Sequence, residues 1–165
     1  TSAGRARWGI FLGVAGTVIV VDQLSKRWLV ANVSAGEVVS VIGDLVRLVQ
    51  SQNSGALFGL FRDQAILFAL VSIGVIGLIA LYHARAGRSL YLSIALGLLL
   101  GGAIGNMLDR LRLGYVVDWV DIGIGSLRFW TFNIADSAIT IAILMLVGLA
   151  LFPALAGGSR GEADA

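Results

Sequence analysis

The stretch SLYLSIALGLLLGGAIGNML, residues 89–108, decides the fold class because it contains no charged side chain. Crossing the hydrocarbon core of a bilayer takes about 20 predominantly apolar residues in an α-helix. Two more uncharged stretches of similar length occupy residues 64–82 and 137–159. A fourth, residues 8–21, reaches spanning length only if its helix continues through the charged segment 22–27. The pattern predicts an all-α membrane protein with four transmembrane helices.

The composition agrees with a location in a membrane. Hydrophobic residues make up 58% and charged residues 13% of the 165 residues, whereas about a quarter of the residues in a soluble domain are charged. The net charge of +2 is small, and the sequence has no basic stripe with interleaved aromatic residues, so nucleic acid is not an expected partner. We expect one membrane domain over residues 1–155 and a disordered cytoplasmic tail over residues 156–165.

The first apolar stretch could also belong to a cleaved signal peptide with Arg5 and Arg7 as its basic region. No small-residue cleavage site follows this stretch, and the segment DQLSKRW at residues 22–28 follows instead. We therefore expect an uncleaved first span.

The connections between the apolar stretches differ in length. Residues 83–88 form a short basic link, whereas residues 32–63 and 109–133 are long and, with an even number of spans, lie on the same side. In the first long connection, EVVSVIGDLVRLV has β-branched residues around a turn signal at 43–44, which predicts a small extracytoplasmic hairpin or sheet. GALFGLF at residues 55–61 is typical of a short interfacial helix. In the second, YVVDWVDIGIGSLRFWTF has an extended pattern with interfacial aromatic residues.

The charge pattern bears on orientation. Five arginines lie on the side of both termini, and seven basic residues lie on the side of the long connections. A plain count of positive charge would place the long connections in the cytoplasm. Those seven, however, are interspersed with acids in segments that we expect to fold at the membrane surface, whereas the short link holds Arg85 and Arg88 without an acid. We therefore expect both termini in the cytoplasm.

Three glycines, Gly97, Gly101 and Gly105, recur every four residues along the third span. On a helix they form a smooth stripe against which another helix can pack closely. Isolated glycines such as Gly74 and Gly77 reflect the general frequency of glycine in membrane helices. The stripe predicts close helix packing and says nothing about chemistry.

Acidic and amide side chains gather at the span ends on the side of the long connections. Ionisable groups at membrane depth are costly, and they usually face the protein interior and have a function. Cysteine is absent and His83 is the only histidine, so thiol catalysis, disulfides and a histidine-based metal site are not expected. The sequence predicts an acid-rich site at one end of the spans, with these members: Asp22, Asp109, Asp118, Asp121, Asp136, Asn53, Asn106 and Asn133.

Two facing carboxylates in a site of low dielectric constant share a proton, because ionising both is unfavourable. The ionised member can act as a general base on a water molecule while the protonated member polarises a carbonyl, as in aspartic proteases. Asp118, in the extended segment, could lie opposite Asp136 at the start of the last span. Spacing alone does not choose this pair. Asp136 could be a helix cap, Asp109 a structural ion-pair partner of Arg110 or a capping group, and Asp121 an exposed loop charge.

Five segments of the chain resemble, in the same order, the motifs of the lipoprotein signal peptidase family. The resemblance runs from about residue 8 to residue 150. One departure is ALFG at residues 56–59, where the family more often has a second alanine followed by Phe-Ser; this affects a wall of the site and could alter substrate or inhibitor fit. The segments are DQLSKRW (22–28), NSGALFG (53–59), GGAIGNMLDR (101–110), VVDW (116–119) and FNIADSAI (132–139).

The resemblance implies that Asp118 and Asp136 form the catalytic dyad of an aspartic endopeptidase. Asp22 and Lys26, four residues apart, also have the spacing of a salt bridge within one helix, and we expect structural or secondary roles for them and for Asp109. Roles in substrate binding or in supporting the dyad are expected for Asn53, Gly55, Asn106, Arg110 and Asn133.

The family's substrate is a prolipoprotein whose cysteine already carries diacylglycerol, and cleavage just before that cysteine removes the signal peptide. The resemblance therefore implies a multi-pass protein of the bacterial cytoplasmic membrane, with its site near the outer face and no metal or organic cofactor. Prolipoprotein and membrane lipid are the expected partners, and we expect a monomer. We also expect the hairpin and the GALFGLF segment, through Phe58 and Phe61, to close over the substrate.

Two other functions remain open at this point. A small transporter or proton-conducting protein could use the same acids as a relay, but it would need polar residues that continue through the bilayer. A non-catalytic assembly protein could use the glycine stripe to bind a partner helix, but the acid-rich end would then be unexplained.

Overall fold

The computed structural model describes residues 2–54, 65–86 and 89–156. The predicted interfacial helix at GALFGLF, Gly55, the departure at residues 56–59 and the proposed closure by Phe58 and Phe61 lie outside these residues. So does the predicted tail, except for its first residue, Ala156.

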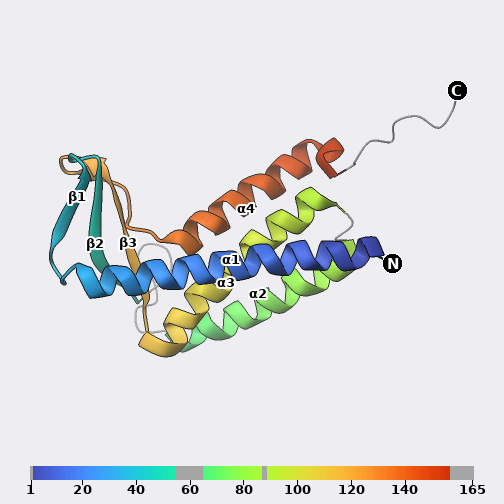
Figure 1. Cartoon of the computed structure of the whole chain (residues 1–165), viewed down its shortest axis with the longest axis horizontal. Helices are drawn as coiled ribbons and strands as arrows, with labels where there is room; N and C mark the ends of the chain where they lie inside the picture. Colours follow the sequence, from blue (N-terminus) through green and yellow to red (C-terminus); the bar gives the residue numbers. More distant parts are fainter. Residues whose placement is uncertain (1, 55–64, 87–88, 157–165) are drawn as a thin grey trace, which may run out of the picture.

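The described part of the chain contains four α-helices, each long and apolar enough to cross a membrane. They run side by side, and a small β-sheet lies at one end of the helices (Figure 1). The predicted class, a four-span membrane protein with a small sheet, is confirmed. The helices are α1 (Ser2–Asn32), α2 (Ala65–Ala86), α3 (Leu90–Leu113) and α4 (Ile134–Leu151).

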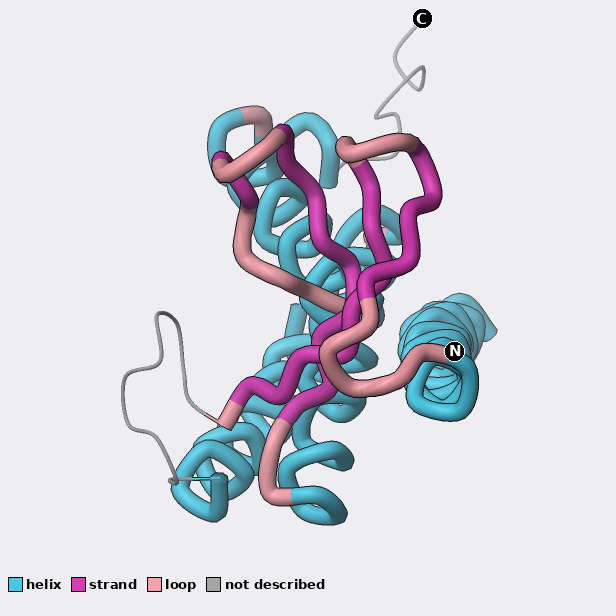
Figure 2. The backbone as a smooth tube through the Cα atoms, turned by 90° about the vertical axis from the view of Figure 1, so that its left-hand side faces the viewer, coloured by secondary structure: helices cyan, strands magenta, loops and turns pink. Residues whose placement is uncertain are grey.

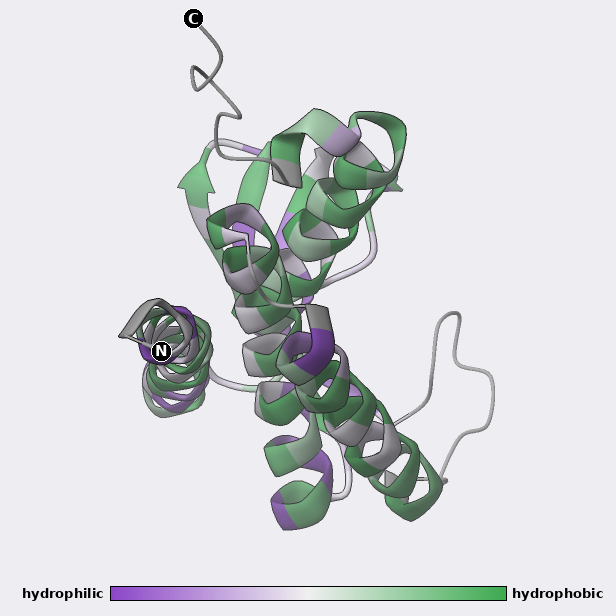
Figure 3. Cartoon of the chain, turned by 90° about the vertical axis from the view of Figure 1, so that its right-hand side faces the viewer, coloured by the Kyte–Doolittle hydropathy of each residue, from purple (hydrophilic) through white to green (hydrophobic). Residues whose placement is uncertain are grey.

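Large apolar side chains are exposed on all four helices. Figure 3, coloured by residue hydropathy, shows that hydrophobic residues predominate along these helices. On α2, for example, Ile66 is 77% and Leu78 67% exposed, and on α4 Leu144 is 65% exposed. A soluble protein rarely exposes apolar patches of this extent, whereas lipid tails solvate them. The exposed apolar surface therefore supports the membrane assignment independently of helix length.

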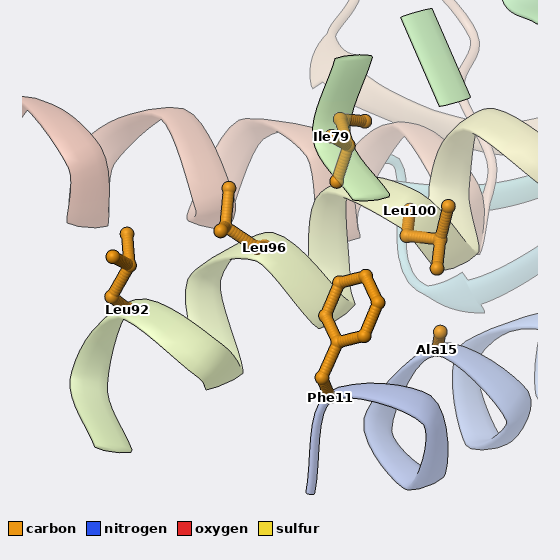
Figure 4. Packing of buried hydrophobic residues seen from close by; sticks show 6 residues of the cluster. All are labelled: Phe11, Ala15, Ile79, Leu92, Leu96 and Leu100. Atoms are coloured by element: carbon orange, nitrogen blue, oxygen red, sulfur yellow. The ribbon is translucent and has the colours of Figure 1, made fainter. Parts of the chain in front are cut away.

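Helix α3 is the centre of the bundle and packs against each of the other three helices. A buried apolar cluster joins α1, α2 and α3 in the half of the bundle away from the sheet. Figure 4 shows its members, which are Phe11, Ala15, Ile79, Leu92, Leu96 and Leu100.

The glycine stripe faces α1, as predicted from its spacing. A Cβ atom on Gly97 would lie 2.8 Å from the carbonyl oxygen of Phe11, and one on Gly101 would lie 2.8 Å from that of Ala15. A Cβ on Gly105 would lie 2.7 Å from a carboxylate oxygen of Asp22. The stripe therefore lets the backbones of α1 and α3 approach closely, and at its last glycine it brings a polar side chain of α1 against α3.

The first helix continues through its charged segment to Asn32, as spanning length required. The last helix is shorter than its uncharged stretch, which continues to residue 159. It ends at Leu151, and Pro153–Ala156 form a 3-10 helix. Pro153 explains this difference, because proline disfavours the helical conformation in the residue before it and offers no N–H to the helix.

The sheet is antiparallel with strand order β1-β2-β3-β4. Strands β1 (Val38–Ile42) and β2 (Val46–Asn53) form the predicted hairpin, and Gly43 in the turn has a φ of 50°, which favours glycine. Strand β3 (Val116–Ile124), from the second long connection, pairs with β2, and β4 (Leu127–Arg128) completes the sheet. Figure 2 shows the strands side by side at this end of the helices. The pairing of β2 with β3 joins the two long connections.

Apolar side chains hold the sheet on the end of α1. Leu29 and Val33 of α1 are buried with Val117 of β3, and side chains of β1 and β2, Val39 and Leu48, pack against them. This contact fixes the position of β3 relative to the helices, and β3 carries Asp118.

Candidate active site

Three elements converge where the sheet meets the helix ends: the last turns of α3, strand β3 and the first turn of α4. They contribute Asn106, Asp118 and Asp136, respectively. Asn133, directly before α4, is fully buried and lies among all three. The structure therefore brings together four of the residues that the sequence placed in the acid-rich site.

Asn133 and Asp136 form a capping box at the start of α4. The side-chain oxygen of Asn133 accepts a hydrogen bond from the backbone N–H of Asp136 at 2.9 Å, and Asp136 accepts one from the backbone N–H of Asn133 at 3.3 Å. Such a box satisfies two of the unpaired donors at a helix start. The cap predicted as an alternative for Asp136 is therefore present, and it orients this carboxylate as well as starting the helix.

Asp118 is 2% exposed and accepts two hydrogen bonds from asparagine amides. Asn53 Nδ2 donates to one carboxylate oxygen at 3.0 Å, and Asn133 Nδ2 donates to the other at 2.7 Å. Asn53 reaches Asp118 because β2 and β3 are paired, with Ser51 opposite Asp118 and Asn53 opposite Val116. Pairing between the two long connections thus supplies one side of the site.

A second asparagine serves Asp136. Asn106 Nδ2 donates to Asp136 Oδ1 at 2.7 Å, while the oxygen of the same amide accepts from Asn133 Nδ2 at 3.2 Å. Each carboxylate therefore has its own amide donor, and the two donors are hydrogen-bonded to each other. The arrangement holds one buried and one partly buried carboxylate in a defined relation.

Burial raises the pKa of Asp118 from its usual 3.8 to about 6, and the nearby negative charge of Asp136 adds to the increase. Hydrogen bonds from Asn53 and Asn133 partly offset this increase, because they stabilise the ionised carboxylate. A carboxyl group with this pKa can hold or release a proton near neutral pH, as acid–base catalysis requires.

A buried ion cluster contacts Asn106 and consists of Asp22, Lys26 and Asp109. Lys26 Nζ lies 2.8 Å from a carboxylate oxygen of Asp22 and 2.8 Å from one of Asp109. The salt bridge predicted between Asp22 and Lys26 is confirmed. The partner predicted for Asp109 is wrong: Asp109 pairs with Lys26 and accepts from the backbone N–H of Val117 at 3.2 Å, because it faces the bundle interior while Arg110 turns elsewhere.

Arg110 donates to the backbone carbonyl of Asn106 at 3.4 Å, and its guanidinium lies 5.5 Å from the ring centroid of Phe68 on α2. Asp121 is not an exposed loop charge. It is buried and pairs with Arg128 at 2.8 Å, because pairing of β3 with β4 encloses it.

Gln23 is a member of this region that the sequence interpretation did not single out. Its side-chain amide donates to Asp109 at 2.9 Å, to Asp22 at 3.2 Å and to the carbonyl of Gly105 at 3.3 Å. A signal was present, since Gln23 lies inside the charged segment of a span and beside Asp22. Neutral polar side chains within a membrane helix, like charged ones, often form hydrogen bonds to neighbouring helices.

The described residues include no cluster of three or more His, Asp or Glu side chains that could hold a metal ion. His83 lies away from the carboxylates, on α2. Its Nε2 contacts Ser93 Oγ at 3.1 Å, and its ring stacks on Phe11 with centroids 4.1 Å apart. The arrangement at the dyad is suited to acid–base chemistry by two carboxyl groups.

Fold and site together define a class of protein, a membrane-embedded aspartic peptidase. The model of one family, described as signal peptidase (SPase) II, matches residues 14–152. The chain therefore belongs to the signal peptidase II family.

Relatives and solved structures agree with this assignment. The lipoprotein signal peptidase of Streptococcus agalactiae serotype V is 40% identical over 131 residues, which cover 79% of this chain and 84% of that protein. That of Streptococcus pyogenes serotype M3 is 39% identical over 131 residues, with 79% and 85% covered. A bacterial membrane enzyme solved by the in meso method at 2.3 Å resolution superposes with a TM-score of 0.82, at 27% identity, over 94% of this chain and 95% of that one.

Proposed function

We propose that this peptidase removes signal peptides from prolipoproteins that carry diacylglycerol, cleaving just before the lipidated cysteine, with Asp118 and Asp136 as its catalytic dyad. One observation carries the proposal: the carboxylates of Asp118, which is buried, and Asp136, which is partly buried, are held by separate asparagine amides that are hydrogen-bonded to each other. Family membership and the name lipoprotein signal peptidase, which its relatives carry, support the substrate class.

In the proposed mechanism the two carboxyl groups share one proton. The ionised member removes a proton from a water molecule, which attacks the scissile carbonyl, and the protonated member donates a hydrogen bond to the carbonyl oxygen. The C–N bond then breaks, and the proton taken from the water molecule passes to the leaving amide nitrogen. The pKa of about 6 for Asp118 supports this sharing, because it keeps the carboxyl close to its titration midpoint near neutral pH.

The location of the site suits a lipidated substrate. Asp136 lies in the first turn of a membrane span and Asp118 in the adjoining strand, so the dyad lies at the level where a span ends. A signal peptide and two acyl chains held in the bilayer would present the adjoining peptide bond at that level. A helical peptide bond is sterically closed to attack, so the substrate must also unwind there.

We further propose that both termini are cytoplasmic and that the dyad faces the outer side of the membrane. The C-terminal end of α2, which carries Arg85, and the N-terminal end of α3 lie at the end of the bundle opposite the sheet (Figure 1), and the sequence between these two helices contains Arg88. Cytoplasmic connections are enriched in basic residues.

A proton relay through the bilayer has less support. Between the polar cluster around Lys26 and the polar pair His83–Ser93 lies the apolar cluster that includes Phe11, Leu96 and Leu100 (Figure 4). A relay would need polar groups across this region.

Cleavage of a synthetic diacylated prolipoprotein by the purified protein in detergent or lipid tests the proposal. We expect the wild type to cut before the lipidated cysteine and Asp118→Asn and Asp136→Asn to fold but lose activity. Asp121→Asn is the matched control, because it removes a buried carboxylate from the same strand outside the dyad, and it should retain activity. An active Asp118→Asn or Asp136→Asn would show that the dyad is misassigned, and a wild type that does not cut would refute the proposed function.

A further inference from the structure

Lys26 has no part in the proposed chemistry, yet it is a buried cation beside the dyad. It is 3% exposed, and its ammonium group has three contacts with acceptors: Asp22 at 2.8 Å, Asp109 at 2.8 Å and Asn106 Oδ1 at 3.1 Å. An ammonium group has three N–H donors and no acceptor. All three donors are therefore used, and one of them points to an asparagine that holds Asp136.

The contact with Lys26 fixes which way the Asn106 amide faces. Because the ammonium group can only donate, the amide must turn its oxygen to Lys26 and its NH₂ group away. The NH₂ group then lies 2.7 Å from Asp136. The opposite orientation would place the amide NH₂ against a cation and the amide oxygen against a carboxylate, and both contacts would be repulsive.

The second asparagine is oriented by the backbone. The oxygen of Asn133 accepts from the backbone N–H of Asp136, and its NH₂ group donates to the backbone carbonyl of Val117 at 3.3 Å and to Asp118 at 2.7 Å. The same NH₂ group also donates to the oxygen of Asn106 at 3.2 Å, next to Lys26 at 3.1 Å. Lys26 and Asn133 together therefore set the direction of the hydrogen bond from Asn106 to Asp136.

We propose that Lys26 is a positioning residue for the dyad: together with Asn133 Nδ2, it holds the oxygen of the Asn106 amide away from Asp136, so that the NH₂ group donates to that carboxylate and helps to keep it ionised. This inference rests on the proposed function, in which Asp118 and Asp136 are the catalytic pair. Without Lys26 only the weaker contact from Asn133 holds the Asn106 amide, which can then rotate and place its oxygen on Asp136, a contact that is favourable only when the carboxyl group is protonated. The dyad would then hold its proton or protons to higher pH.

Charge alone must be separated from amide orientation. The charged groups around the pair are Asp22 and Lys26 from α1 and Asp109 and Arg110 from α3, in addition to the two dyad members themselves. Removing Lys26 also removes a positive charge, which by itself favours protonated carboxyl groups. The double variant Asp22→Asn/Lys26→Met keeps the net charge of the cluster and still lacks the donor to Asn106.

The experiment compares three variants with the wild type: Lys26→Met, Asp22→Asn/Lys26→Met and Asp22→Asn. Methionine is unbranched and flexible and fills the space of the lysine stem without a donor. Asp22→Asn loses an ion pair but retains Lys26 and its contact with Asn106, so it is the matched control for disruption of the cluster. The double variant also removes one of the two carboxylates, Asp22 and Asp109, that lose their cation in Lys26→Met, which favours its folding.

The first measurement is the pH dependence of kcat and kcat/KM for cleavage of the diacylated prolipoprotein. We expect both limbs of the profile to move to higher pH in the two variants that lack Lys26, and kcat at a fixed low pH to fall by about tenfold or more, the effect of one charge-assisted hydrogen bond. KM should change much less than kcat. In Asp22→Asn the limbs should stay in place or move to lower pH, because that variant loses a negative charge.

A purely structural Lys26 would give a different result, in which the amplitude of the profile falls in all three variants while its limbs stay in place. That outcome, in folded protein, would overturn the inference. A shift in Lys26→Met that disappears in the charge-balanced double variant would also overturn it, because charge alone would then explain the effect.

Infrared titration of the protonated carboxyl band, with and without Asp118→Asn as a reference, provides a readout without substrate. If the wild type does not cleave the prolipoprotein, the proposed function fails, but this titration still tests whether Lys26 controls the protonation of the pair. A carboxyl titration that is unchanged in Asp22→Asn/Lys26→Met would refute the inference under either outcome.

Discussion

Asn133→Ala should reduce both stability and activity, because Asn133 contacts both the last helix and the proposed dyad. Its side chain is fully buried, caps α4 through the backbone N–H of Asp136 and donates to Asp118 at 2.7 Å. Alanine removes these two contacts, together with the longer ones to Asn106 and Val117, and leaves the donor at the start of α4 without its acceptor. We expect a folded but destabilised protein with very low activity.

The expected size follows from the two lost contacts. Loss of a helix cap costs about 1 kcal/mol, and loss of a hydrogen bond to a charged group costs roughly 1.5–3 kcal/mol. The free energy of unfolding should therefore fall by about 2.5–4 kcal/mol. If the bond to Asp118 is also needed in the transition state, kcat should fall by about ten- to a hundredfold.

Asn133→Ser is the matched variant, because serine also caps helices but is too short to donate to Asp118. Unfolding by denaturant in detergent micelles, monitored by circular dichroism, would measure stability, and cleavage of the diacylated prolipoprotein would measure kcat. Serine should recover about 1 kcal/mol of stability and none of the lost kcat. The acid limb of the activity profile should move to higher pH in both variants, because a donor that lowers the pKa of Asp118 is gone.

Two results would refute this reasoning. If Asn133→Ser restored kcat together with stability, the amide of Asn133 would matter only as a cap. If Asn133→Ala lost stability but kept the wild-type kcat, the hydrogen bond to Asp118 would have no role in the reaction.

Three further predictions concern stability, all measured by unfolding in micelles. The folded-state pKa of Asp118 is about 6, against an ordinary value of 3.8, so between these pH values the folded wild type binds more protons than the unfolded chain. The free energy of unfolding of the wild type should therefore fall relative to that of Asp118→Asn as pH rises from 3.8 to about 6, with no further change at higher pH. A constant difference between the two proteins over this range would contradict the raised pKa. Gly101→Val should destabilise by roughly 1–3 kcal/mol, because its Cβ would lie 2.7 Å from Val18 Cβ, whereas Gly77→Val, with nothing within 4 Å of the added Cβ, should have little effect; equal effects would show that the stripe is not a packing surface. Phe11→Ala should cost about 3–5 kcal/mol, because the ring is 1% exposed within the apolar cluster, and a cost below about 1 kcal/mol would mean that the cluster collapses to fill the space.

The helices could be predicted from the sequence because the cause is local. An uncharged stretch such as residues 89–108 must satisfy its backbone hydrogen bonds within itself in a bilayer, and a helix does this. The hairpin was predicted for a similar reason, since the Gly43 turn and the β-branched residues around it are close in sequence. The end of α4 does not follow from the apolar pattern, because the uncharged stretch continues past Pro153 to residue 159 whereas the helix ends at Leu151.

The partners of the acids could not be predicted in the same way. Asp109 lies beside Arg110 in sequence but pairs with Lys26, and Asp121 pairs with Arg128 across the β3–β4 turn. Adjacent residues on a helix point in different directions, so proximity along the chain is a poor guide to ion pairs. Gln23 was overlooked because it carries no charge, although the fold buries it among charged groups.

The spacing of residues 53, 106, 118, 133 and 136 identified a set of polar residues, and the resemblance to a family selected two of them as catalytic. Spacing alone left Asp109, Asp118, Asp121 and Asp136 as competing candidates. The structure separates them by environment: Asp109 and Asp121 each face a cation, whereas Asp118 and Asp136 face asparagine amides and each other.

Local sequence thus establishes the four spans, the end of the membrane domain at which polar groups gather and the hairpin, because each depends on residues near one another in the chain. The tertiary structure alone decides which acids pair with a cation and which are held by asparagine amides. That decision depends on the pairing of β2 with β3 and on the approach of α1 to α3 along the glycine stripe, which join residues as distant as Asn53 and Asp118 or Lys26 and Asn106. Electrostatic energies depend on such distances and on burial, and neither can be read from the order of residues along the chain.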